Sequence, residues 1–287
     1  MNLKNRIDIF HILAAFMTFI SLLCVAGMFL FLVVESVPIL TEQKWSFFLG
    51  QDWWVGEVYG ALPMIYGSCM VTGVALLLVL PLALGGAVFT SEFLSPKQRL
   101  WVKALMELFA GIPGIIYGLL GIALLSGFVK NSFGLIDGNT ILTAGLLLGV
   151  MILPTILTLA EDALNAVSGQ YRDTSLSLGL TKLQMIKSAV IPEALPGIAG
   201  AVFLGLGRAM GETIAVMLVI GGLDKIADPW FDLFQPAQSI ASKLGREAAE
   251  AIGSGQQWSA LMALGLVLFL MVMVLTLMGN FFLKRVR

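Results

Sequence analysis

Six long apolar stretches dominate this sequence, and each is long enough to cross a membrane as a helix. An α-helix needs about 20 mainly apolar residues to cross a hydrocarbon core of roughly 30 Å. Charged residues make up 12% of the chain, compared with about 25% in soluble domains. We therefore predict an all-α membrane protein with six transmembrane helices, at Ile9–Val34, Ala61–Phe89, Leu108–Val129, Thr140–Ala160, Gly197–Gly222 and Trp258–Leu283.

The basic residues between these stretches are distributed unequally. With six spans, eleven Lys and Arg residues lie on the side that holds both termini and five on the other, with Arg208 inside the fifth stretch. Because cytoplasmic loops carry the excess of Lys and Arg, both termini are predicted to be cytoplasmic. We expect residues 1–60 to form a peripheral first helix with an outer segment. Residues 61–287 should form a five-helix core, with a cytoplasmic loop at about 161–195 and an outer loop at about 223–257.

The sequence lacks the usual signatures of an enzyme. It contains no Gly-x-Ser nucleophile elbow and no Walker-type Gly-Lys-Ser/Thr, the motifs that position a catalytic serine or cradle nucleotide phosphates. Two cysteines and one histidine are too few for an ordinary zinc site. We predict no catalytic residue, no metal and no cofactor, so any nucleotide hydrolysis that drives this protein takes place on another chain.

Two charged residues, Arg208 and Glu212, interrupt the fifth apolar stretch. If Gly197–Gly222 is one helix of about 39 Å, Arg208 lies about 16 Å from its start, near the bilayer centre. An unpaired guanidinium there costs on the order of 3 kcal/mol or more. We therefore expect Arg208 to meet an anion that crosses the membrane, and Glu212, one turn further along, to hold the arginine when the site is empty. The alternative is a static pair that only locks two helices together.

Two local patterns modify the simple helical prediction. Gly111–Gly118, at the start of the third stretch, contains Pro113 and should bend or break that helix. It would serve either close helix packing or the lining of a pore. In the outer loop, Ala237–Ala251 is predicted to form a helix whose apolar residues recur every four positions.

The connection 161–195 has the features of a helix–turn–helix element. A short helix should end at Gly179, a residue suited to a C-cap, and Thr181 should begin the next helix. Such an element could dock a cytoplasmic partner. The alternative is an ordinary connection between two helices.

The same segment resembles the cytoplasmic loop of membrane subunits of bacterial ABC importers. These subunits carry Glu-Ala-Ala, three residues, Gly, nine residues and then Ile-x-Leu-Pro. Here Asp173, Thr174 and Ser175 take the first positions, Gly179 the glycine and Pro192 the proline. The resemblance implies a type I ABC importer permease fold and a loop, beginning at Arg172, that sits in a groove of the ATPase and couples its closure to the spans.

Three further segments are similar to permeases of phosphate importers, of the C-subunit type: Tyr59–Gly67, Gly111–Gly118 and Gly205–Thr213. The resemblance implies a bacterial inner-membrane heterodimer with a second permease subunit, two ATPase subunits and a periplasmic phosphate-binding protein, surrounded by membrane lipid and with no nucleic-acid partner. It also implies that Arg208, Glu212 and Thr213 line the phosphate pathway.

Two other functions remain open at this point. One is a permease for another oxyanion, such as sulfate or molybdate, within the same machinery. The other is a secondary anion transporter that needs no ATPase, for which paired inverted halves would be expected.

Overall fold

The computed structural model describes residues 3–284, with side-chain surroundings for residues 10–281. Arg285 and Arg287, which contribute to the predicted excess of positive charge, lie outside the described residues, as do the side chains of Lys4, Arg6 and Lys284. The elements in chain order are α1 (Leu3–Gln43), α2 (Trp45–Leu49), β1 (Trp53–Trp54), β2 (Val58–Tyr59), α3 (Leu62–Glu92), α4 (Pro96–Ala110), α5 (Gly114–Leu120), the π-helical turn η1 (Gly121–Ser126), α6 (Gly127–Phe133), α7 (Ile141–Asn165), α8 (Gly169–Ser177), α9 (Lys182–Met185), the π-helical turn η2 (Ile186–Val190), α10 (Ile191–Met210), α11 (Ile214–Val219), α12 (Ile240–Glu247) and α13 (Gln256–Lys284).

The prediction of six membrane helices is confirmed. By length and composition, the helical runs able to cross a membrane are Phe10–Gln43, Leu62–Glu92, Gly114–Phe133, Ile141–Ala166, Lys182–Met210 and Gln256–Phe281. The second, fourth and sixth match the predicted stretches within six residues at each end, and the first runs nine residues past its predicted end at Val34. The third and fifth have different boundaries, and both differences affect the functional site.

The third stretch was predicted to begin at Leu108, but the chain breaks at Gly111–Pro113. Pro113 has no N–H and disfavours a helical conformation in the residue before it, which ends α4. Helix α4 is therefore a separate element, begun by a capping box between Ser95 and Gln98. The expected break at this proline is confirmed, and the span itself runs from Gly114 to Phe133.

The fifth stretch was predicted as one helix, Gly197–Gly222, and this prediction is wrong. The helical run begins earlier, at Lys182, and ends at Met210; a non-helical break then precedes α11. Pro192 does not stop the run, because the π-helical turn η2 immediately before it relaxes the normal hydrogen-bond pattern. The residue after Met210 is Gly211, whose backbone is still right-handed; glycine weakens a helix at this position because it has more conformational freedom to lose.

The core of the bundle is formed by α3 and α7. Gly145 and Gly149 on α7 allow close approach: a Cβ on Gly145 would lie 2.5 Å from Val74 Cγ1, and one on Gly149 2.8 Å from Val79 Cγ2. Small residues at such crossings are the usual means of packing helices in membranes. Helix α7 also packs against α4, α10 and α11, so it is the central helix of the site described below.

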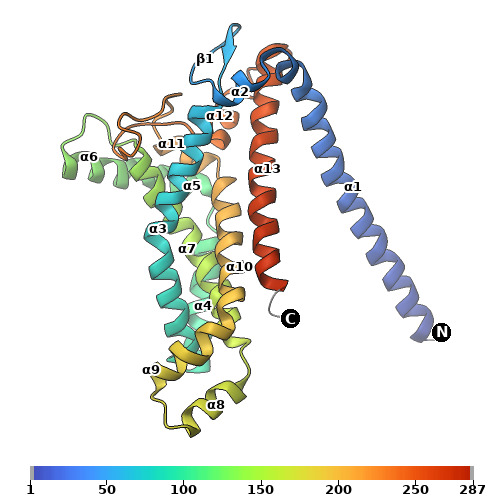
Figure 1. Cartoon of the computed structure of the whole chain (residues 1–287), viewed down its shortest axis with the longest axis vertical. Helices are drawn as coiled ribbons and strands as arrows, with labels where there is room; N and C mark the ends of the chain where they lie inside the picture. Colours follow the sequence, from blue (N-terminus) through green and yellow to red (C-terminus); the bar gives the residue numbers. More distant parts are fainter. Residues whose placement is uncertain (1–2, 285–287) are drawn as a thin grey trace.

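Helix α1 lies at the edge of the bundle and diverges from α13 toward its own start (Figure 1). It is attached near its other end, where Trp258 Nε1 donates to Glu35 Oε2 at 2.9 Å and Ser259 Oγ donates to the Glu35 carbonyl at 2.5 Å. The outer segment that follows contains a short antiparallel hairpin, β1–β2, with Trp53 buried and Trp54 exposed.

The elements gather at two ends of the bundle. The start of α1, the end of α13 and the helices α8 and α9 lie at one end, and the hairpin and α12 lie at the other (Figure 1). This arrangement agrees with the predicted grouping of loops and termini; the assignment of the first end to the cytoplasm rests on the charge count. The predicted outer helix Ala237–Ala251 is shorter than expected, Ile240–Glu247, because Ser239 caps its start with Ser242.

Candidate functional site

The guanidinium of Arg208 lies where α4, α7 and α10 meet. Its Nη1 donates to Thr155 Oγ1 at 2.9 Å and its Nη2 to the carbonyl of Ala110 at 3.2 Å. Thr155 is fourteen residues from the start of α7 and ten from its end, which corresponds to about 21 Å and 15 Å along the helix. The guanidinium therefore lies beside the middle of α7, while Arg208 itself is two residues from the end of α10. Its predicted position near the bilayer centre stays a prediction.

The predicted pairing of Arg208 with Glu212 is wrong. Among residues 10–281, no carboxylate lies within ion-pair distance of Arg208. Since α10 ends at Met210, Glu212 no longer shares a helical face with Arg208. Glu212 Oε1 accepts a hydrogen bond from the backbone N–H of Ala215, at the start of α11, at 3.4 Å. The same oxygen lies so close to Gly114 of α5 that a Cβ added to this glycine would be only 2.7 Å from it. Glu212 thus lies between the starts of α5 and α11.

Thr213 completes the break between α10 and α11. Its hydroxyl donates to the Gly211 carbonyl at 3.2 Å, and its methyl group would be 2.7 Å from a Cβ on Gly245 of α12. Thr213 is half-buried, whereas Gly211 and Arg208 are exposed in this chain. Arg208 is therefore not buried among the helices of this chain.

The predicted turn between two helices in the loop 161–195 is confirmed. Helix α8 ends at Ser177, Gly179 has a left-handed φ of 82°, and Thr181 forms a capping box with Gln184 at the start of α9. Large apolar side chains surround this turn and face outward: Leu176, Leu178 and Leu183 are 48%, 77% and 71% exposed.

The residues predicted for coupling divide into outward and inward positions. Asp173 and Thr174 are exposed, whereas Ser175 is buried and its hydroxyl donates to the carbonyl one turn back at 2.7 Å. Pro192 lies in the first turn of α10. The exposed residues of α8 are available for contact with another protein, and the buried ones attach α8 to this chain.

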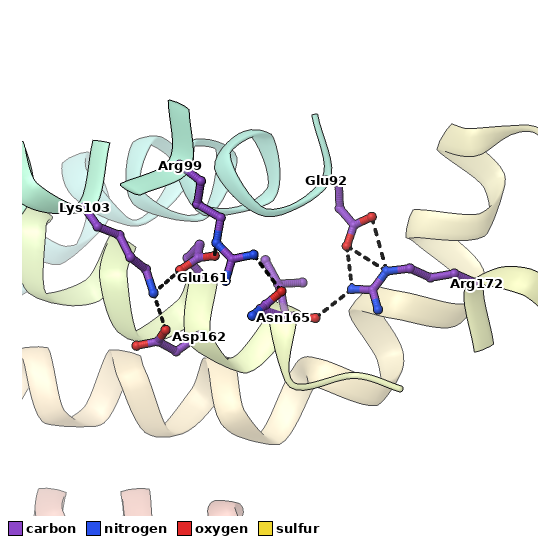
Figure 2. Close-up of polar contacts among 8 residues, drawn as sticks. Glu92, Arg99, Lys103, Glu161, Asp162, Asn165 and Arg172 are labelled. Carbon is purple, nitrogen blue, oxygen red and sulfur yellow. Dashed lines mark hydrogen bonds and ion pairs between the residues drawn. The ribbon is translucent and has the colours of Figure 1, made fainter. Parts of the chain in front are cut away.

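Arg172 points inward, toward the ends of two membrane helices (Figure 2). Its Nη2 lies 2.7 Å from Glu92 Oε1 at the end of α3, and Nη2 also donates to the Leu164 carbonyl of α7 at 2.9 Å. Nη1 donates to the Val167 carbonyl at 2.6 Å. Arg172 therefore attaches α8 to α3 and α7.

A second charged cluster joins α4 to the same end of α7, and the sequence analysis missed it (Figure 2). Glu161 is fully buried, and its carboxylate oxygens lie 2.5 Å from Arg99 Nε and 2.6 Å from Lys103 Nζ. Lys103 also pairs with Asp162, and Arg99 Nη1 donates to Asn165 Oδ1 at 2.7 Å. A signal was present: Glu161 directly follows an apolar stretch, and a buried carboxylate requires partners.

The chain is similar to a family of transport proteins. Residues 82–287 match the family described as "Binding-protein-dependent transport system inner membrane component". The phosphate transport system permease protein PstC of Mesorhizobium japonicum is 32% identical over 97% of this chain and 90% of its own length. The protein of the same name from Pasteurella multocida is 34% identical over 94% and 89%.

Solved structures share the fold at lower identity. A chain of the MetNI methionine ABC transporter aligns with a TM-score of 0.57 and 19% identity, covering 79% of this chain and 94% of its own. A chain of a bacterial alginate ABC importer aligns with a TM-score of 0.56 and 16% identity, covering 96% and 98%. The fold is that of a type I ABC importer permease, and the chain belongs to the family of binding-protein-dependent inner membrane transport components.

Proposed function

We propose that this chain is the transmembrane permease subunit of an ATP-driven importer of inorganic phosphate, and that Arg208 is the residue that meets the anion. The observation that carries this proposal is an exposed arginine beside the middle of α7, whose guanidinium contacts, in the described part of the chain, are a hydroxyl and a carbonyl. A planar guanidinium binds two oxygens of an oxyanion at once. The names of the relatives specify phosphate as the anion.

Within residues 10–281, no carboxylate forms an ion pair with Arg208, which favours anion entry. An anion then replaces a neutral carbonyl and need not displace Glu212, in contrast to the competition that the sequence suggested. Glu212 and Thr213, at the break after α10, complete the proposed pathway. Because glycine at 211 leaves this turn without a side chain, the backbone there lies open to the anion.

We propose that the importer contains a second permease subunit, two ATPase subunits and a periplasmic phosphate-binding protein. The turn between α8 and α9 is the proposed ATPase contact, with Asp173, Thr174 and Gly179 on its surface. Its three exposed leucines support this proposal, since a docked partner would remove them from water. Arg172 would then carry movement of α8 to α3 and α7.

The test is ATP-dependent uptake of labelled phosphate by the assembled complex in proteoliposomes, with the loaded binding protein supplied. Arg208→Gln should reduce uptake about ten-fold or more, because a charge-assisted contact is lost. Lys130→Gln, which removes an exposed cation from α6, is the matched control and should leave uptake unchanged. Undiminished uptake by assembled Arg208→Gln would overturn the assignment, and suppression of phosphate uptake by excess sulfate or molybdate would indicate a different oxyanion.

A further inference from the structure

Thr155 differs from two other threonines of the membrane helices in how its hydroxyl is bonded. Thr158 on the same helix, and Thr276 on α13, donate their hydroxyl protons to carbonyls one turn back, at 2.8 Å and 2.9 Å. This is the usual arrangement for a hydroxyl in a membrane helix. Among the contacts of residues 10–281, the Thr155 hydroxyl instead accepts from Arg208 Nη1, and its own proton has no acceptor.

A hydroxyl has one proton to donate and two lone pairs that accept. Because Arg208 occupies one lone pair, the proton of Thr155 remains available beside the guanidinium. Thr155 is half-buried, and Arg208 beside it is exposed. The two side chains therefore present adjacent N–H and O–H donors to anything that reaches the guanidinium.

The second contact of Arg208 is easily exchanged. Nη2 donates to the Ala110 carbonyl at 3.2 Å, longer than the 2.7–2.9 Å or so that is typical when a cation meets a carboxylate or phosphate. Ala110 is the last residue of α4, where the helix dipole places partial negative charge. This carbonyl contacts the guanidinium through a long hydrogen bond, and a fully charged oxyanion would be the stronger partner.

We propose that Thr155 is a second ligand of the transported oxyanion. In the occupied site, Arg208 Nη1 stays on Thr155 Oγ1, Nη2 turns from the Ala110 carbonyl to one anion oxygen, and the Thr155 hydroxyl donates to another. The proposal rests on the proposed function of Arg208. It adds a neutral donor, which fixes the orientation of the anion without adding charge that would slow its release.

The experiment measures phosphate uptake and ATP hydrolysis in the same proteoliposomes, at a saturating concentration of loaded binding protein. Thr155→Val keeps the side-chain shape and removes the hydroxyl. It should lower the phosphate transported per ATP hydrolysed by about ten-fold, with ATP hydrolysis unchanged. Thr155→Ser restores the hydroxyl and should restore the ratio.

Thr158→Val is the matched control, because it removes a hydroxyl one turn away that only bonds within its helix; its ratio should match the wild type. If Thr155→Val assembles poorly, Thr155→Ala tests the same loss with a smaller side chain. A parallel fall of uptake and hydrolysis in the Thr155 variants would assign them a structural role and overturn the proposal, as would an unchanged ratio. Arg208→Gln in the same vesicles separates the two hypotheses, since normal uptake there contradicts the site itself.

Discussion

Replacing Glu161 by glutamine removes one buried negative charge that two cations share. The carboxylate is fully buried and lies 2.5 Å from Arg99 Nε and 2.6 Å from Lys103 Nζ. Removing one partner of a buried ion pair costs about 3–5 kcal/mol, because the remaining charge has lost its water. Here the side chains of Arg99 and Lys103 are still 24% and 21% exposed to solvent, and Lys103 keeps its ion pair with Asp162. We therefore expect Glu161→Gln to destabilise the protein by about 3 kcal/mol, the lower end of that range.

The assay is the melting temperature of the purified complex, read as the fraction that stays monodisperse after heating. One kcal/mol shifts the melting temperature of a chain of this size by about 2–4 °C, so Glu161→Gln should melt roughly 6–12 °C below the wild type. Asp162→Asn is the matched control: that carboxylate is 59% exposed and pairs only with Lys103, a contact expected to contribute about 0–1 kcal/mol. Equal melting temperatures for the two variants would refute the reasoning that burial determines the cost.

Three further predictions concern the same end of the bundle. Glu92→Gln removes the charge bound by Arg172 at 2.7 Å, so α8 should loosen and ATP hydrolysis should continue with less phosphate uptake, measured as their ratio. Gly179 has a left-handed backbone with φ 82°, and leucine at this position would adopt that conformation at a cost of about 1–2 kcal/mol. The ATPase should therefore co-purify less well with Gly179→Leu than with Gly179→Asn, because asparagine tolerates a left-handed backbone. Burial lowers the pKa of Lys103, but its two carboxylate partners outweigh that effect and raise it above 10.5. The stabilisation that Lys103 gains from its two carboxylate partners should therefore be constant up to about pH 9 and disappear as the pH rises through the folded-state pKa of Lys103. The measurement is the difference in melting temperature between the wild type and Lys103→Met, which should shrink over that pH range.

The spans and the turn of the coupling loop could be predicted because their causes are local. Apolar length alone identifies a membrane helix. Gly179 ends one short helix and Thr181 begins the next through contacts within four residues. The break after Met210 was not predicted, because Gly211 stands within an apolar stretch and has a right-handed backbone that an unbroken helix also allows.

The partners of Arg208 could not be predicted, because they are distant in sequence. Thr155 lies 53 residues away and Ala110 lies 98 residues away, on different helices. The sequence offered only Glu212 at a helical spacing, and continuation of α10 would have been needed to bring the two together. The Glu161 cluster was not predicted either, because its cations, Arg99 and Lys103, are also distant from Glu161 in sequence. They lie on α4, whose last residues the apolar pattern assigned to the third span.

The strength of the contacts around α7 indicates which helices stay together during transport. At its end, α7 is joined to α4 by the buried Glu161 cluster, whose disruption costs about 3 kcal/mol by the reasoning above. Helix α10 packs closely along α7 as well: a Cβ on Gly205 would lie 2.5 Å from Ile156 Cγ1, and one on Gly197 would lie 2.6 Å from Ala163 Cβ. Such close apolar packing is the usual means of holding helices together in a membrane. Both α4 and α10 are therefore held to α7, and the three helices should move as one unit. Distances between spin labels on α4 and α7, and between labels on α7 and α10, should stay constant through the ATP cycle, and a change in either would contradict this assignment.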